Sequence, residues 1–115
     1  MAQLLIVDDE PTLLSLLRRY LERQGHQLET CGSAEEALPI FAKDPAGFDL
    51  VITDLTLPGA SGAELIAQLR ALNPTVPALI ASGFPYEPQL PGVEFLQKPF
   101  LPQMLAEHIA RLVKP

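Results

Sequence analysis

The sequence predicts an α/β domain with a parallel sheet and helices on both of its faces. Three observations support this class. Short apolar runs alternate with segments of helical periodicity along the chain. Several of the apolar runs end in a polar or charged residue. No linker, repeat or change of composition divides the 115 residues. We therefore expect residues 1–115 to form a single domain.

The first expected elements are a strand, a helix and a second strand. Residues 3–7 form a short apolar run bounded by charge, which is typical of a buried strand. Pro11 stands where a helix tolerates proline, leucines follow at helical spacing, and Gly25 marks the expected stop. Residues 27–31 form a weaker second strand.

The next expected elements are a helix and a third strand. Ser33 and Glu36 have the spacing of a capping box, so a helix should begin there and run to about Lys43. Pro39 lies inside this helix, where it should remove a hydrogen bond or cause a kink. Residues 49–53 are the third expected strand.

The rest of the chain is expected to hold two more strands and two more helices. Ser61 and Glu64 form another capping-box pattern, at the start of a helix that closes near Asn73. Apolar runs predict strands at 76–81 and 93–96, and helical spacing predicts a last helix at 102–113.

Composition and charge exclude several classes of function. The chain is 48% hydrophobic and 19% charged, which argues against disorder. Its net charge of −6 argues against a nucleic acid as direct partner, because phosphate contacts need clustered Lys and Arg. We expect no membrane segment and no signal peptide. The single cysteine, Cys31, suits a reducing compartment, so we expect a cytoplasmic location.

Polar residues collect at the ends of four expected strands. Asp8 and Asp9 follow the first strand, Asp54 the third, Ser82 the fourth and Lys98 the fifth. Taken singly, Asp8 could cap a helix, Ser82 could belong to a turn and Lys98 could be a surface lysine. In parallel sheets, however, the carboxyl ends of the strands share one edge, which is where ligands bind. We expect the five side chains to converge there.

This set of side chains suits phosphoryl transfer. Three carboxylates repel one another unless a cation lies between them, and oxygen ligands are those that Mg²⁺ prefers. Mg²⁺ and Lys98 would neutralise phosphoryl oxygens, Ser82 could donate a hydrogen bond, and Asp54 would be the nucleophile. The sequence has neither of the glycine-rich nucleotide-binding motifs, G-x-x-x-x-G-K-[ST] and G-x-G-x-x-G.

The chain closely resembles the receiver domain of two-component response regulators. The resemblance spans the whole chain and rests on four segments in order: "LLIVDDE" at 4–10 followed by Pro11, "DLVITDLTLPGASG" at 49–62, "LIASG" at 79–83 and "FLQKPF" at 95–100. It implies a flavodoxin-like, doubly wound sheet of five parallel strands in the order 2-1-3-4-5, normally with five helices.

The resemblance also implies roles for particular residues. Asp54 would accept a phosphoryl group from a histidine kinase or a histidine phosphotransfer protein. Asp9, Asp54 and the backbone carbonyl of Thr56 would hold Mg²⁺, while Asp8 would act largely through water. Lys98 would pair with the phosphoryl group. The switch pair would be Ser82 and Phe95, and the Lys98–Pro99 peptide bond would be cis.

One departure from the family concerns the fourth helix. Its place is taken by "GFPYEPQLPGVEF" at 83–95, in which Pro85, Pro88 and Pro91 recur at three-residue intervals. Each proline lacks a donor and disfavours a helical conformation at the residue before it. We expect this helix to be short or absent, which calls the usual route of output into question. Alternatively, the loop simply fills the same space.

Two alternative functions are weaker. An aspartate-nucleophile phosphatase of the haloacid dehalogenase type would need a second Asp where this chain has Thr56. A pseudo-receiver that only binds partners would not need the intact set of site residues. The expected protein is a receiver, either a single-domain regulator or a domain of a longer chain such as a hybrid histidine kinase. We expect a monomer or a weak dimer, with a downstream protein partner that the sequence does not name.

Overall fold

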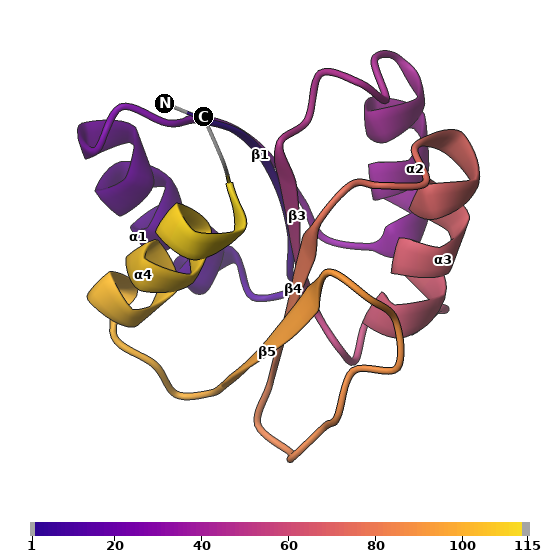
Figure 1. The fold of residues 1–115 in the computed structure, drawn as a ribbon. Coiled ribbons are helices and arrows are strands. Elements are labelled where there is room, and N and C mark those ends of the chain that lie inside the picture. The colour runs from indigo at the N-terminus through magenta and orange to yellow at the C-terminus, as the bar shows by residue number, and fades with distance from the viewer. Residues whose placement is uncertain (1, 114–115) are drawn as a thin grey trace.

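The computed structural model describes residues 2–113 of the chain and contains five strands and four helices (Figure 1). In chain order these elements are β1 (Gln3–Val7), α1 (Pro11–Arg23), β2 (Gln27–Cys31), α2 (Ala34–Ala42), β3 (Leu50–Asp54), α3 (Gly62–Leu72), β4 (Ala78–Ser82), β5 (Val93–Gln97) and α4 (Pro102–Leu112).

The strands form one parallel sheet in the order β2-β1-β3-β4-β5, which confirms the predicted topology. In Figure 1, α1 and α4 lie on one side of the sheet and α2 and α3 on the other. This is the doubly wound arrangement, in which every carboxyl end of a strand points to the same edge.

The core lies in two layers, one on each face of the sheet. Along β1, Leu4 and Ile6 face the layer covered by α1 and α4, whereas Leu5 and Val7 face the layer covered by α2 and α3. This alternation follows from the two-residue period of a strand. Because both faces are covered, the central strands are almost continuously apolar rather than alternately polar.

The two expected helix caps differ in detail. Ser61 and Glu64 form a complete capping box at the start of α3. At α2 the Ser33 hydroxyl accepts a hydrogen bond from the Glu36 N–H, but the Glu36 carboxylate accepts one from the N–H of Gly32 instead of Ser33. The second box is therefore only half formed, because Glu36 satisfies a donor one residue further back.

Three strands differ in their bounds from the sequence prediction. β5 only ends one residue later, at Gln97, whereas the shifts of β3 and β4 matter for the edge of the sheet. β3 begins and ends one residue later than expected, so Asp54 is its last residue. β4 begins two residues later, after Pro77, and includes Ser82. Asp54 and Ser82 thus belong to the hydrogen-bonded strands and are fixed more rigidly than loop residues would be.

The family's usual fourth helix is absent. Residues 83–92, which we call the crossover, link β4 to β5 without a helix or a strand. Pro85, Pro88 and Pro91 supply no backbone donor, so the hydrogen-bond ladder of a helix cannot form here. The helix labelled α4 in Figure 1 is the last one, after β5.

None of the helices in residues 2–113 combines the length and the apolar character required to cross a bilayer.

Candidate functional site

The three predicted carboxylates meet at the carboxyl edge of the sheet. Asp8 directly follows β1, Asp9 comes next, and Asp54 ends β3, which lies beside β1. One carboxylate oxygen from each of the three residues lies within 4.8 Å of the others. Asp8 is buried, Asp54 is half-buried and Asp9 is exposed. The acidic cluster therefore has one side open to solvent.

Lys98 supplies the cation on the protein side of this cluster. Its Nζ lies 2.8 Å from Asp8 Oδ2, 3.3 Å from Asp54 Oδ2 and 3.3 Å from Glu10 Oε1. The Lys98 backbone N–H donates to the Ser82 carbonyl at 2.8 Å, which fixes the lysine beside the end of β4. The Lys98–Pro99 peptide bond is cis, as the resemblance implies.

The pKa values of Asp54 and Lys98 are shifted by burial and by the charges of the neighbouring site residues. Burial raises the pKa of the Asp54 carboxyl; Lys98 opposes this increase and the neighbouring Asp8 carboxylate adds to it. Burial alone would lower the pKa of Lys98, but hydrogen bonds and attraction from Asp8 and Asp54 outweigh it, so the pKa is raised. The site thus favours a positively charged lysine and would gain from a further cation beside Asp54.

Ser82 and Thr56 flank Asp54 from two directions. Ser82 is buried, and its hydroxyl accepts a hydrogen bond from the Phe84 N–H at 3.0 Å. No hydrogen bond joins the Ser82 hydroxyl to Asp54 in the described part of the chain. Thr56 is exposed, and its backbone N–H donates to Asp54 Oδ1 at 3.4 Å. The structure therefore places Ser82 one residue beyond the partner of Asp54 on the neighbouring strand, without a hydrogen bond between their side chains in the described residues.

The second expected switch residue, Phe95, is half-buried on β5 beside Ile80 of β4. Its ring packs against Tyr86 of the crossover, with ring centroids 6.4 Å apart and an interplanar angle of 56°. The tilt suits the preference of aromatic rings for edge-to-face contact. This contact has no signal in the sequence, because Tyr86 is a loop residue nine positions before Phe95.

Sequence reasoning also missed two residues of the site. Glu10 contacts Lys98, and its position in the acidic run that contains Asp8 and Asp9 could have suggested this. Gly62 begins α3 directly against the end of β3. Its N–H donates to the Leu55 carbonyl, and a Cβ placed there would lie only 2.2 Å from the Asp54 carbonyl oxygen. Only a glycine allows α3 to approach Asp54 this closely.

The donor chemistry of this edge fits Mg²⁺. The side-chain donors of Asp8, Asp9 and Asp54 are all carboxylate oxygens, without the imidazole or thiolate that zinc prefers. Few protein ligands and an open side leave room for the water molecules that Mg²⁺ usually retains.

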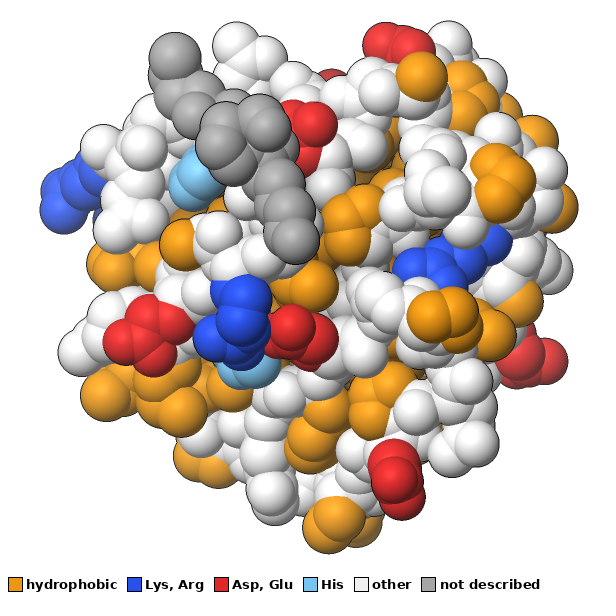
Figure 2. All heavy atoms as spheres, in the orientation of Figure 1, with side chains coloured by type: hydrophobic (Ala, Val, Ile, Leu, Met, Phe, Trp, Pro, Cys, Tyr) orange, Lys and Arg blue, Asp and Glu red, His pale blue; other side chains and the backbone are white. Residues whose placement is uncertain are grey.

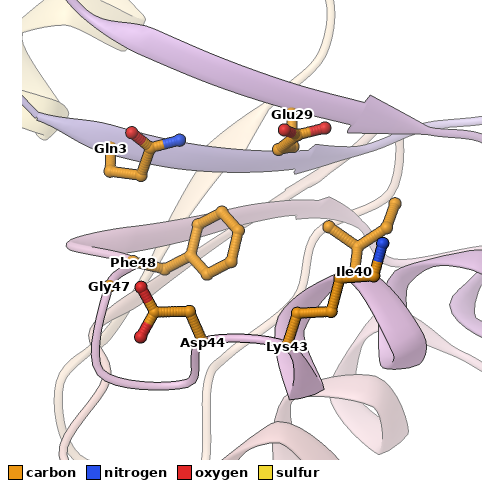
Figure 3. Close-up of a pocket in the computed structure, with 7 residues that line it drawn as sticks. All are labelled: Gln3, Glu29, Ile40, Lys43, Asp44, Gly47 and Phe48. Carbon is orange, nitrogen blue, oxygen red and sulfur yellow. The ribbon is translucent and has the colours of Figure 1, made fainter.

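A separate hollow of about 380 Å³ lies away from this site. Figure 3 shows that Gln3 and Glu29 line it from the strands, whereas Lys43 and Asp44 line it from the segment that follows α2. Gln3 begins β1 and Phe48 precedes β3, so the hollow borders the amino ends of these strands. Nothing in this hollow resembles the acidic cluster, and the chemistry concentrates at the other edge.

The strand order and the lysine-paired acidic edge define a doubly wound α/β domain with an acidic cluster at its strand ends that could hold a cation. The family model of the response regulator receiver domain matches residues 4–110. The chain therefore belongs to the response regulator receiver domain family.

Among curated proteins, the chain is 33% identical over 116 residues to response regulator protein FleR of Pseudomonas aeruginosa. The match covers 96% of this chain but only 24% of FleR. A second relative, transcriptional regulatory protein ResD of Bacillus subtilis, is 30% identical, and the match covers 97% of this chain and 48% of ResD. The chain thus spans about a quarter to a half of these relatives.

Solved structures agree in fold over nearly the full chain. The receiver domain of the hybrid histidine kinase CckA has a TM-score of 0.89 and 31% identity, covering 97% of this chain and 99% of that one. Response regulator protein TrrA of Thermotoga maritima, in complex with Mg²⁺ and beryllium fluoride, has a TM-score of 0.85 and 31% identity over 97% and 99%. TrrA in complex with histidine kinase ThkA has a TM-score of 0.83 and 29% identity over 99% and 100%.

Proposed function

We propose that this domain accepts a phosphoryl group on Asp54 and thereby acts as a signalling receiver. One observation carries this proposal: the Asp54 carboxylate ends a central strand beside two further acids and is contacted by Lys98. An acidic group held in this way has a cation partner on one side and space for Mg²⁺ on the other. We further propose that residues 1–115 form one receiver domain.

Asp9, Asp54 and the Thr56 carbonyl would hold Mg²⁺, with Asp8 acting largely through water. When bound, Mg²⁺ supplies positive charge that offsets the negative charge of phosphoryl oxygens. Lys98 already lies within hydrogen-bonding distance of Asp54, so its ammonium group can pair with a phosphoryl oxygen after transfer. Ser82 can donate its hydroxyl hydrogen to the same phosphoryl group.

The proposed transfer step uses these groups. A carboxylate oxygen of Asp54 attacks the phosphorus of a phosphohistidine, and a P–O bond forms as the P–N bond breaks. The electron pair of the P–N bond goes to the imidazole nitrogen, and the histidine side chain is the leaving group. If the imidazole is not already protonated, it takes a proton from solvent. The product on this chain is an acyl phosphate. Asp54 would act as the nucleophile, while Lys98 would stabilise the charge that develops.

A histidine kinase or a histidine phosphotransfer protein is the proposed donor. The solved complex of TrrA with ThkA supports this choice, because it pairs a structurally similar receiver with a histidine kinase. We place the exchange in the cytoplasm, in keeping with the single free cysteine, Cys31.

Acetyl phosphate tests this proposal directly. The protein is incubated with acetyl phosphate and Mg²⁺, with and without excess EDTA, and its intact mass is measured. We expect the mass of one phosphoryl group to be added per chain, only with Mg²⁺ and not in Asp54→Asn.

A matched control keeps the acidic edge intact. Asp49→Asn removes a carboxylate at the opposite edge of the sheet and should be modified like the wild type. Modification of Asp54→Asn at the wild-type rate would overturn the assignment of Asp54. Repeated release of phosphate from an ester substrate would instead indicate a phosphatase.

A further inference from the structure

Glu10 stands at the start of α1 but does not cap the helix. It is the N-cap residue, its backbone is extended, and its side chain makes no capping hydrogen bond among the described residues. Asp, Asn, Ser and Thr are the residues that usually satisfy the free N–H groups at a helix start. A position that departs from such a local rule is expected where the residue serves a functional site instead.

The polar groups of Glu10 are turned toward the acidic edge. Its backbone N–H donates to Asp8 Oδ1 at 2.9 Å, and its carboxylate oxygen Oε1 accepts a hydrogen bond from Lys98 Nζ at 3.3 Å. Lys98 Nζ also donates to Asp8 Oδ2 at 2.8 Å. Three hydrogen bonds thus join Glu10, Asp8 and Lys98 in a closed ring, which ties the start of α1 to the end of β5.

The ammonium group of Lys98 already has as many partners as it has hydrogens to donate. A lysine ammonium carries three N–H donors and no acceptor. Its three partners here are the carboxylates of Asp8, Asp54 and Glu10. By contrast, acidic side chains lie apart from one another on the face that Figure 2 draws. A phosphoryl oxygen that pairs with Lys98 must therefore displace one of the three partners.

The three partners differ in how readily they can be released. The side chain of Asp8 is 5% exposed and that of Asp54 is 13% exposed, whereas the side chain of Glu10 is 62% exposed. A buried carboxylate that loses its cation remains unpaired away from water, which is costly. An exposed carboxylate is hydrated as soon as it is released. Glu10 is therefore the partner that Lys98 loses at least cost.

We propose that Glu10 is a positioning residue that holds Lys98 in the unphosphorylated site and gives it up to a phosphoryl group on Asp54. This inference rests on the proposed phosphorylation of Asp54. Because Glu10 and the phosphoryl group compete for the same donor, Glu10 makes the phosphorylated form less favourable than a side chain without this contact would. The residue thereby limits how firmly the site retains a phosphoryl group.

Two substitutions separate the Lys98 contact from the charge of Glu10. Glu10→Gln keeps the length of the side chain and removes its charge. Glu10→Asp keeps the charge, but its side chain is one methylene shorter and suits the free N–H groups at the start of α1. Both changes should weaken the hold on Lys98. Urea unfolding in EDTA first establishes that both variants are folded.

Beryllium fluoride, which TrrA binds together with Mg²⁺, takes the place of the phosphoryl group in the test. Its affinity is measured at saturating Mg²⁺ by ¹⁹F NMR of the bound species. We expect each variant to bind it about threefold more tightly than the wild type, the effect of one exposed ion pair. A variant that merely disturbed the fold would bind it more weakly, so tighter binding reports the release of Lys98.

Glu22→Gln is the matched control. Glu22 is an exposed glutamate near the other end of α1, where its carboxylate lies 3.1 Å from Arg18. The change removes the same charge and an ion pair of the same kind from the same helix. We expect Glu22→Gln to bind beryllium fluoride as the wild type does.

The remaining outcomes separate this inference from the proposed function. Wild-type affinity in folded Glu10→Gln would overturn the role of Glu10 and leave Asp54 as the acceptor site. Tighter binding in Glu10→Gln but not in Glu10→Asp would also overturn it, because the charge and not the contact would then be responsible. A wild-type protein that binds no beryllium fluoride in Mg²⁺ would contradict the proposed function and this inference together.

Discussion

At the scale of single residues, the positive charge of Lys98 offsets the negative charge of the acidic site. It contacts Asp8, Asp54 and Glu10, and its side chain is 16% exposed. In the absence of a bound metal, it is the cation that these carboxylates contact within residues 2–113. Attraction to Asp8 and Asp54 raises the pKa of Lys98 despite burial, so the lysine remains charged. The site is therefore stabilised by Lys98 even before any phosphoryl group arrives.

Removal of this charge should make the fold depend on a metal ion. In Lys98→Met, Asp8 and Asp54 lose their counter-charge, and we expect the free energy of unfolding in EDTA to fall by about 2 kcal/mol. Mg²⁺ should restore much of this loss, so it should raise the melting temperature more in the variant than in the wild type. Urea and thermal unfolding, with EDTA and with Mg²⁺, measure both effects.

Lys43→Met is the matched control, since Lys43 is an exposed lysine just after α2 and far from the acidic edge. It should respond to Mg²⁺ as the wild type does. An equal gain from Mg²⁺ in Lys98→Met and Lys43→Met would contradict the balancing role of Lys98.

Cys31 shows how burial changes the pKa of a thiol. Burial, with the negative charge of Glu36 adding to it, raises the pKa of the Cys31 thiol to about 11, above the ordinary value of 9.0. We expect alkylation by iodoacetamide in the folded protein to increase with pH up to about 11, whereas the urea-unfolded chain should titrate near its ordinary value.

The sign of the stability effect follows from this shift. Between the two pKa values the folded state holds the thiol proton that the unfolded state has released, so stability should fall as pH rises from about 9 to about 11. Cys31→Ala should lack that part of the alkaline loss. The same reactivity profile in folded and unfolded protein would show that the thiol is not shielded.

At the scale of elements, the junction of β3 and α3 fixes Asp54. The complete capping box of Ser61 and Glu64 starts α3, and the Gly62 N–H bonds to the Leu55 carbonyl at 2.7 Å. The first turn of α3 therefore lies directly against the end of β3. Because α3 packs against the end of β3, the backbone of Asp54 is held in place and its carboxylate stays at the edge of the sheet.

Gly62→Ala should disturb this junction. The added methyl carbon would lie 2.2 Å from the Asp54 carbonyl oxygen, so α3 or the end of β3 must move. We expect the free energy of unfolding to fall by about 2 kcal/mol, as for other overpacked sites. Mg²⁺ should also bind more weakly, which titration calorimetry can measure, because Asp54 moves with its backbone.

Gly83→Ala is the control for this change. A Cβ at Gly83 meets no atom within 4 Å, and the residue lies just after β4 at the same edge of the sheet. We expect nearly wild-type stability and Mg²⁺ binding. A Gly62→Ala protein as stable as Gly83→Ala would show that the close approach of α3 is not required.

At the scale of the whole molecule, two core layers lie on either side of one sheet, and the last helix completes one of them. α4 buries Leu105 and Ile109 against the layer that α1 also covers. A polar cluster links α4 to the edge strand β5: Glu94 lies 2.8 Å from Arg111 and 2.7 Å from His108. This cluster connects α4 to β5, the strand at one edge of the sheet.

Glu94 should make the attachment of α4 depend on pH. The hydrogen bond from Arg111 lowers the pKa of Glu94 below its ordinary value of 4.5; burial opposes this shift and His108 adds to it. A lowered pKa in the folded state gives stability that is present above the ordinary pKa and lost as pH falls through the lowered value.

Glu94→Gln should therefore reduce the unfolding free energy near pH 7 by less than about 1 kcal/mol, because the groups are partly exposed and screened. The difference from wild type should shrink as the pH is lowered below the ordinary pKa of 4.5, which urea unfolding at pH 7 and at a series of acidic pH values can measure. Glu87→Gln, an exposed change in the crossover, should show no such trend. A Glu94→Gln deficit that persists in acid would point to packing rather than charge.

Local sequence pattern was sufficient to predict the class of fold and most members of the site. Strand and helix differ in the period of their apolar residues, so local pattern located all nine elements within about two residues. Parallel topology then required Asp8, Asp54, Ser82 and Lys98 to share one edge. The spacing of Pro85, Pro88 and Pro91 was enough to predict the missing helix, because proline acts on its own backbone and on the residue before it.

Contacts between residues far apart in the chain could be found only in the folded structure. The bond between Lys98 and Glu10, the approach of Gly62 to Asp54 and the packing of Tyr86 on Phe95 depend on the twist of the sheet and on how the loops settle. The hydrogen bond from the Phe84 N–H to the Ser82 hydroxyl likewise depends on how this loop folds. Local pattern carries no information on distances of a few ångströms, because those distances are set by packing across the whole domain.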